Sequence, residues 1–117
     1  MNISNEQSLD HAALSDLREA TEEMFTEIIE AFLEDSPKRL HSLSEAVSIS
    51  DINTMKEESH GLKGSSGNIG AVKLSKICEE IEARSKDNLI TNQAELIQHA
   101  IDEFEHINRE LSKLITN

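Results

Sequence analysis

The stretch HGLKGSSGNIGA, residues 60–71, contains all four glycines of this 117-residue chain. Outside it, the sequence has a single proline, Pro37, and no glycine at all. Tight turns between strands depend on glycine and proline, so a fold built from many short strands would lack the residues that its turns require. The sequence therefore predicts helices on both sides of this glycine-rich stretch.

Apolar residues on both sides of the stretch recur at steps of three and four, which is the period of an amphipathic helix. The spacing predicts five helices, over residues 9–20, 25–47, 52–69, 74–86 and 97–114. The connections between them are short, so consecutive helices are expected to pack antiparallel. The predicted fold is all-α: an antiparallel four-helix bundle with a short extra N-terminal helix, forming one domain over residues 1–117.

A few residues are expected to shape the ends and the course of these helices. Pro37 falls inside the second helix, where it would either kink the helix or divide it in two. Ser50 or Asp51 is a candidate N-cap for the third helix. Gly70 is expected just past the end of the third helix, because glycine readily adopts the left-handed conformation that ends many helices.

Charge and composition exclude several classes of partner. The chain has 23 acidic and 11 basic residues, which gives a formal net charge of -12. Binding to nucleic acid or to an anionic membrane needs an excess of Lys and Arg, so neither is expected. No apolar run approaches the length of a membrane span, and the first residues lack the basic and apolar regions of a secretory signal. The single cysteine, Cys78, cannot form an internal disulfide, and the sequence fits a cytoplasmic protein.

Helical geometry places one histidine on an exposed stripe of the third helix. At about 100° per residue, His60 points away from the apolar face of this helix. The same exposed stripe contains Lys63, about 60° from His60, and three residues within about 40° of it: Lys56, Gly64 and Gly67. A glycine in a helix interior costs about 1 kcal/mol relative to alanine, so the glycines of this helix indicate either a function or close packing against a neighbouring helix, the latter above all at Gly61.

The exposed stripe suits the transfer of a phosphoryl group between proteins. A neutral imidazole nitrogen is a good nucleophile for phosphorus, and glycine backbone beside it lets the surface of another protein approach closely. The ammonium group of Lys63, one turn from His60, can offset part of the charge of a phosphoryl group. The chain has no G-x-x-x-x-G-K-[ST] motif for ATP, so the phosphoryl group is expected to come from another protein.

Residues 60–71 also resemble the signature of histidine-containing phosphotransfer (HPt) domains, which serve multistep two-component signalling. That signature runs His, any residue, Leu, Lys, Gly, Ser, a small residue, two residues of any kind, an apolar residue, Gly and Ala. Upstream, the stretch FLEDSP at residues 32–37, followed by Leu40, is similar to the second helix of the family, which carries a proline at this point. The resemblance covers nearly the whole chain, from about Leu9 to the C-terminus.

The resemblance implies that His60 is the phospho-acceptor, that Lys63 lies near the phosphoryl group and that Gly64 gives a receiver domain access. A phosphoryl group would pass from an aspartate on one receiver domain to His60, and then to an aspartate on another. The receiver domain would supply the acidic pocket and Mg²⁺, so the chain would need no cofactor and no ATP site of its own. The implied partners are response-regulator receiver domains and a hybrid sensor histidine kinase. We expect a monomer, and a docking surface that includes Lys56, Glu57, Gly64 and Gly67.

Two other functions compete with this interpretation. One is an HPt-like docking module that binds receiver domains without relaying phosphate, although the presence of both His60 and Lys63 argues against it. The other is a di-metal carboxylate bundle, because Glu57-x-x-His60 and Glu103-x-x-His106 have the spacing used by ferritin-like sites. Such ligands must point into the bundle, whereas both histidines are expected opposite the apolar faces of their helices. We therefore expect no metal site.

Overall fold

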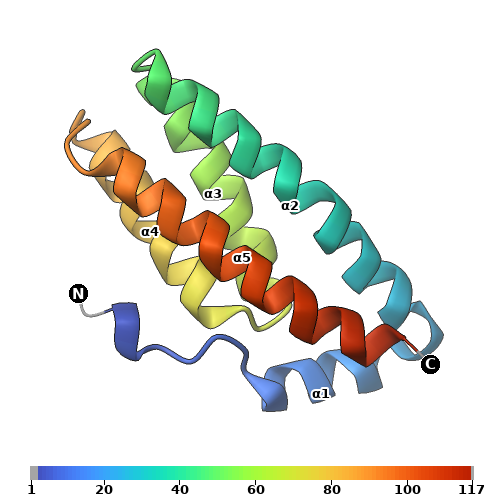
Figure 1. Cartoon of the computed structure of the whole chain (residues 1–117). Coiled ribbons are helices and arrows are strands. Elements are labelled where there is room, and N and C mark those ends of the chain that lie inside the picture. The colour runs from blue at the N-terminus through green and yellow to red at the C-terminus, as the bar shows by residue number, and fades with distance from the viewer. Residues whose placement is uncertain (1–2, 117) are drawn as a thin grey trace.

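The computed structural model describes residues 3–116, most of which lie in helices (Figure 1). The elements in chain order, with η for a short 3-10 helix, are η1 (Ile3–Asn5), α1 (His11–Thr21), η2 (Glu22–Met24), α2 (Phe25–Ser48), α3 (Ile52–Asn68), α4 (Val72–Lys86) and α5 (Gln93–Ile115). No strand forms within residues 3–116, and no helix there is both long enough and apolar enough to cross a membrane. The prediction of an all-α fold is confirmed.

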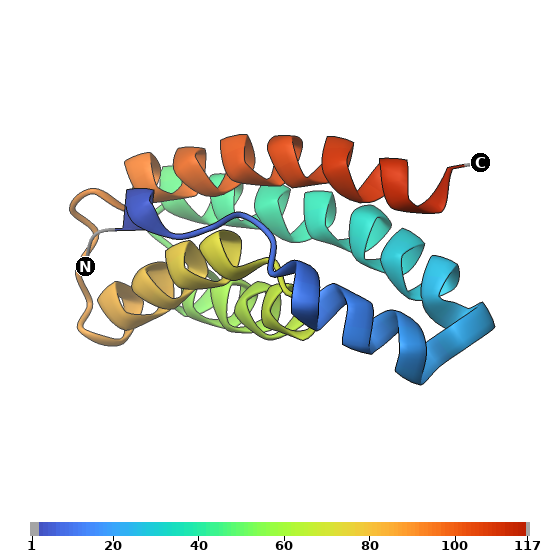
Figure 2. The same cartoon turned by 90° about the horizontal axis from the view of Figure 1, so that it is seen from below.

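The four long helices, α2 to α5, form an antiparallel bundle (Figure 1). α3 packs between α2 and α4, and α5 closes the bundle by packing against both α4 and α2. α1 lies across one end, beside the start of α2 (Figure 2). There the guanidinium of Arg18 donates a hydrogen bond of 3.0 Å to the backbone carbonyl of Leu114, near the end of α5. The predicted bundle with a short extra N-terminal helix is therefore the observed fold.

The core is aliphatic, and all four long helices contribute to it. Fully buried side chains include Ile29, Leu43, Met55, Leu62, Leu74, Ile81, Ile107 and Leu111. The rings of Phe32 and Phe104 pack with centroids 6.0 Å apart and join α2 to α5. Burying one such side chain contributes about 1.5–3 kcal/mol, so this burial, rather than helix propensity, holds the helices together.

α2 runs through Pro37 as one helix. Proline lacks the N–H that would bond the carbonyl of Leu33, and it commonly kinks or ends a helix. Phe32 and Leu40, on either side of Pro37, are buried, so both halves of α2 are held against the core. The expected alternative of two helices meeting at Pro37 is wrong, because tertiary packing outweighs the lost hydrogen bond.

A side-chain cap and a close backbone contact define the two ends of α3. Asp51, rather than Ser50, caps its start: Oδ1 of Asp51 accepts a hydrogen bond of 3.1 Å from the N–H of Thr54. Past its end, Gly70 has a φ of +78°, and a Cβ there would lie 3.1 Å from the carbonyl oxygen of Asp10. The N–H of Asp10 donates to the carbonyl of Gly70 at 2.8 Å. The N-terminal segment thus packs on the turn after α3 and fixes the helix that carries the exposed stripe.

Candidate functional site

His60 lies in the middle of α3, with 68% of its side chain exposed. Ser59 and Leu62, on the inner face of the same helix, are fully buried. The hydroxyl of Ser59 donates a hydrogen bond of 2.6 Å to the carbonyl of Met55, so this small polar side chain is satisfied within its own helix. The imidazole is therefore carried by a well-packed helix and has its outer edge in solvent.

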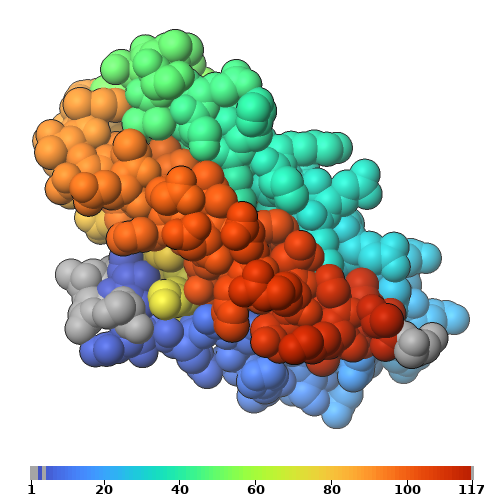
Figure 3. All heavy atoms as spheres, in the orientation of Figure 1, coloured from blue at the N-terminus to red at the C-terminus, as the bar shows by residue number. Residues whose placement is uncertain are grey.

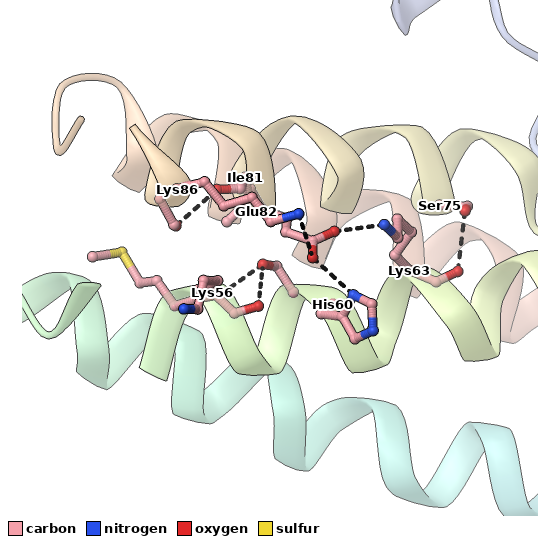
Figure 4. Close-up of polar contacts among 10 residues, drawn as sticks. Lys56, His60, Lys63, Ser75, Ile81, Glu82 and Lys86 are labelled. Carbon is pink, nitrogen blue, oxygen red and sulfur yellow. Dashed lines mark hydrogen bonds and ion pairs between the residues drawn. The ribbon is translucent and has the colours of Figure 1, made fainter. Parts of the chain in front are cut away.

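A buried glutamate on the neighbouring helix holds the imidazole in place (Figure 4). Glu82 of α4 has only 5% of its side chain exposed, and its Oε2 lies 2.7 Å from Nδ1 of His60. Its Oε1 accepts a hydrogen bond of 2.6 Å from Nζ of Lys63. Nζ of Lys86 lies 3.5 Å from Oε2. One carboxylate thus links two residues of the exposed stripe to α4.

These contacts keep Glu82 ionised. Burial alone opposes the charge, but the hydrogen bonds from Lys63 and His60 and the charges of Lys63 and Lys86 outweigh it and lower the pKa of Glu82 to about 2. An ionised carboxylate only accepts hydrogen bonds, so the shared proton is assigned to Nδ1 of His60. In the neutral imidazole Nε2 then carries the lone pair, and an electrophile can reach it from the solvent side.

Lys63 lies one turn after His60, with 31% of its side chain exposed. The hydrogen bond to Glu82 raises the pKa of Lys63; burial opposes this effect, and the charges of Glu82 and Glu79 add to it. The hydroxyl of Ser75 on α4 donates a hydrogen bond of 3.1 Å to the backbone carbonyl of Lys63. Both the backbone and the ammonium group of Lys63 are therefore tied to α4, an arrangement that the sequence did not reveal.

Three glycines of α3 differ in what surrounds them. A Cβ at Gly64 would meet no atom within 4 Å, so the backbone there opens to solvent. At Gly67 a Cβ would lie 3.5 Å from Oγ of Ser75, an ordinary contact with α4. At Gly61 it would lie 2.3 Å from Nη1 of Arg39, a residue of α2. The space beside Gly64 is open, whereas the space beside Gly61 is filled by a side chain of α2.

Lys56 and Glu57, the other predicted docking residues, lie one turn before His60 on α3. Lys56 is half-buried and, together with Lys86, lines a hollow of about 260 Å³ between α3 and the end of α4. Glu57 is exposed, and its carboxylate accepts a hydrogen bond of 3.2 Å from the side chain of Asn53. Lys56, Lys63 and Lys86 place positive charge on this side of the site, on a chain whose net charge is -12.

Sequence reasoning missed Glu82 and Lys86, both of which lie on α4. Glu82 occupies the buried face of α4, next to Ile81 and one turn after Cys78. A carboxylate among buried positions needs a partner, and this mismatch was the signal that the sequence contained. The identity of the partner depends on helix packing, because His60 and Glu82 are 22 residues apart in the chain.

A further hollow lies away from His60, between the N-terminal segment, α4 and α5. Figure 3 shows the N-terminal segment (blue) beside α5 (orange to red). The hollow measures about 490 Å³, its lining includes Ile3, Ile77 and Glu103, and it contains none of the predicted site residues. Among residues 3–116, no three His, Cys, Asp or Glu side chains gather as metal ligands. Glu103 is buried and His106 is exposed, so the two do not point into the bundle together.

A protein-family model described as the Hpt domain matches residues 27–115. The chain belongs to the Hpt family. Among solved structures, the crystal structure of histidine-containing phosphotransfer protein B (HptB) from Pseudomonas aeruginosa PAO1 is similar to this Hpt chain, with a TM-score of 0.90 and 29% sequence identity. The match covers 92% of this chain and 94% of that one. The comparison with curated proteins found no match.

Membership of the Hpt family establishes the general role of the chain, which is histidine phosphotransfer in a phosphorelay. Hpt domains interact with receiver domains in such relays. The resemblance inferred from residues 60–71 is confirmed, and the family match runs from α2 into the end of α5.

Proposed function

We propose that this Hpt domain relays phosphoryl groups through Nε2 of His60, from an aspartate of one receiver domain to an aspartate of another. The observation that carries the proposal is the 2.7 Å contact between Nδ1 of His60 and the carboxylate of Glu82. It leaves the lone pair on Nε2, at the exposed edge of the ring. A histidine that accepts phosphate from another protein must be both nucleophilic and accessible, and this arrangement supports both requirements.

In the forward step, Nε2 attacks the phosphorus of a receiver phospho-aspartate in line. The Nε2–P bond forms while the P–O bond to the aspartate breaks, and the aspartate leaves as a carboxylate. The imidazole of His60 keeps its proton on Nδ1, so the ring becomes positively charged while it carries the phosphoryl group. The nearby carboxylate of Glu82 stabilises that charge. In the second step, a carboxylate of another receiver attacks the same phosphorus. The N–P bond breaks, and Nε2 leaves with its lone pair.

Lys63 would offset the negative charge of the phosphoryl group on His60. In the unphosphorylated state, Glu82 holds the ammonium of Lys63 through a hydrogen bond of 2.6 Å. Lys63 lies one turn of α3 after His60. Phosphoryl oxygens on Nε2 would offer this ammonium further acceptors without a change of helix position. The acidic pocket and Mg²⁺ would come from the receiver domain. For the transfer itself, this chain would contribute only side chains and no cofactor.

The receiver domain would dock on the exposed face of α3, over Gly64. The open space at Gly64 supports this placement. The surrounding docking residues are Lys56, Glu57, Gly67 and Lys86. Because one surface has to serve successive partners, we expect a transient interface at the low end of the size range, below about 1,200 Å². We propose that a monomer accepts the phosphoryl group from a hybrid sensor kinase and delivers it to a response regulator.

Phosphoryl transfer from a phosphorylated receiver domain tests the proposal. The wild-type chain should acquire a label that is labile in acid and stable in alkali, as expected of a phosphorus–nitrogen bond. His60→Gln should acquire none. His99→Gln and His106→Gln, which alter exposed histidines of α5, are matched controls and should be labelled like the wild type.

Two results would contradict the relay. Label on the His60→Gln variant would mean that another residue accepts the phosphoryl group. Receiver binding by the wild-type chain without any label would favour the docking module instead.

A further inference from the structure

The space beside Gly61 is occupied by the guanidinium of Arg39, which reaches across from α2. A Cβ at Gly61 would lie 2.3 Å from Nη1 of Arg39, 2.7 Å from Cζ and 3.2 Å from Nη2. No residue other than glycine can stand at this position unless Arg39 moves. Because Gly61 directly follows His60, the guanidinium lies against the turn of α3 that carries the imidazole.

Two carboxylates hold Arg39 in this position. Nε donates to Oδ2 of Asp35, one turn earlier on α2, at 3.0 Å, and Nη1 contacts Oε1 of Glu58 on α3 at 3.5 Å. The first contact uses the Nε side of the group, and the second is long for a charged hydrogen bond. A guanidinium has five N–H donors, and no group of residues 3–116 accepts from Nη2. The edge formed by Nη1 and Nη2 thus retains free donors, on a side chain that is 33% exposed.

The position of Arg39 distinguishes it from the lysines of the site. Lys63 and Lys86 lie on the α4 side of His60, where Glu82 pairs with both. Arg39 lies on the opposite side, toward α2. Residue 61 projects about 100° around the helix from residue 60, and the imidazole is turned toward Glu82. Arg39 therefore lies on the α2 side of the turn of α3 that carries His60, on the other flank from Glu82.

We propose that Arg39 is a partner-recognition residue: its Nη1–Nη2 edge binds a carboxylate on the receiver domain that docks over His60, and Gly61 makes room for it. The inference rests on the proposed relay through His60 and adds a specificity-determining contact to it. A planar guanidinium pairs with a carboxylate through two parallel hydrogen bonds, which the point charge of a lysine cannot reproduce. Asp35 and Glu58 orient the group in advance, so less freedom is lost when the partner binds.

Single-turnover transfer from a receiver domain charged with acetyl phosphate tests this inference. The receiver used is the one, from a panel, that donates fastest to the wild-type chain. In Arg39→Gln, the receiver concentration that gives half the maximal rate should rise about tenfold, a loss of about 1.4 kcal/mol in binding, while the maximal rate stays the same. Arg39→Lys should recover only part of this loss. Lys38→Gln removes an exposed positive charge from the preceding position of α2, and it should behave like the wild type.

Gly61→Ala tests the role of the glycine, because the added Cβ must displace Arg39. It should reproduce the effect of Arg39→Gln. The double variant should be no worse than Arg39→Gln alone, since Gly61 acts only through Arg39. Circular dichroism and urea midpoints establish that each variant folds. If Gly61→Ala does not fold, the receiver concentrations that give half the maximal rate in Arg39→Gln and in Lys38→Gln still decide whether Arg39 contacts the receiver.

Several outcomes would overturn the inference. If Arg39→Gln leaves unchanged the receiver concentration that gives half the maximal rate, the guanidinium does not contact the receiver. If the maximal rate falls while that concentration stays the same, Arg39 acts in the chemical step instead of in recognition. A further loss when Gly61→Ala is added to Arg39→Gln would mean that the glycine acts independently. Failure of the relay itself is distinguishable, because the wild-type chain would then take no label at any receiver concentration.

Discussion

Replacing Glu82 by glutamine would remove the charge that links α3 to α4 and nearly preserve the shape of the side chain. A glutamine amide has one oxygen acceptor and one NH₂ donor group. It cannot accept hydrogen bonds from His60 and Lys63 through two separate oxygens, as Glu82 does at 2.7 and 2.6 Å. The Glu82→Gln variant therefore tests whether one carboxylate both stabilises the packing of these helices and orients the imidazole.

The expected loss of stability follows from the pKa of Glu82, which the fold lowers from 4.5 to about 2. At about 1.4 kcal/mol per pKa unit, this difference corresponds to at most about 3.5 kcal/mol. Two of the partners, Lys63 and Lys86, are 31% and 61% exposed, so solvent screening reduces the effect. We expect Glu82→Gln to lower the free energy of unfolding by about 1–2 kcal/mol at neutral pH.

The sign of the pH dependence follows from the same pKa. The folded state binds the Glu82 proton less tightly than the unfolded state does, so the stabilisation is complete above about pH 4.5 and is lost as the pH falls toward 2. Urea unfolding followed by circular dichroism should show the largest difference between wild type and Glu82→Gln near neutral pH, and a shrinking difference in acid. Glu79→Gln alters an exposed carboxylate of the same helix and should change stability by less than about 0.5 kcal/mol. A difference between wild type and Glu82→Gln that stays constant with pH would refute this reasoning.

The same variant should alter His60. In the wild type, imidazole ¹⁵N spectra should show the tautomer with its proton on Nδ1. In Glu82→Gln both tautomers should appear, because an amide can either accept from Nδ1 or donate to it. Phosphoryl transfer should slow about tenfold, which corresponds to about 1.4 kcal/mol in the barrier. An unchanged tautomer with an unchanged rate would reduce Glu82 to a purely structural residue.

Three further predictions follow from the site and the core. Gly64→Ala should raise the free energy of unfolding by about 1 kcal/mol, because its Cβ would meet nothing within 4 Å, and it should also slow transfer from a receiver. Thermal unfolding and transfer rates, measured on the same protein, test the two parts. A stabilised variant with normal transfer would contradict the access role. Lys63→Gln should shorten the lifetime of the phosphoryl group on His60 about tenfold in a label-decay assay, whereas Lys38→Gln should leave it unchanged, and equal decay in the two would show that Lys63 does not offset the charge. Burial raises the pKa of the Cys78 thiol to about 12, so iodoacetamide should modify it in urea but not in the native chain at pH 8; rapid modification of the native chain would contradict its burial.

The helices and the exposure of His60 could be predicted because they depend on neighbours along the chain. Steps of three and four place Met55 and Leu62 on the face of α3 opposite to His60, and the structure buries both. The N-cap at Asp51 and the positive φ of Gly70 also depend on only a few adjacent residues. Backbone geometry sets these relations wherever the helix lies in the fold.

The course of α2 and the start of α5 could not be predicted in the same way. Pro37 is compatible with a break or with a continuous helix, and the burial of Phe32 and Leu40 decides for the continuous helix. α5 begins at Gln93, before the predicted start at Ile97. The buried amide of Gln93 bonds the carbonyl of Ile81 on α4 at 3.1 Å, a contact that leaves no periodic signal in the sequence.

The sequence by itself determined an all-α bundle, one exposed histidine on its third helix and the family to which the signature around it belongs. Only the tertiary structure decided which side chains meet across helices: Glu82 with His60 and Lys63, and Arg39 with the space at Gly61. The physical reason is that the period of a helix follows from its own backbone. The side chains that face each other between helices depend on how each helix is rotated and shifted against its neighbour, and the packing of the whole core sets that rotation and shift.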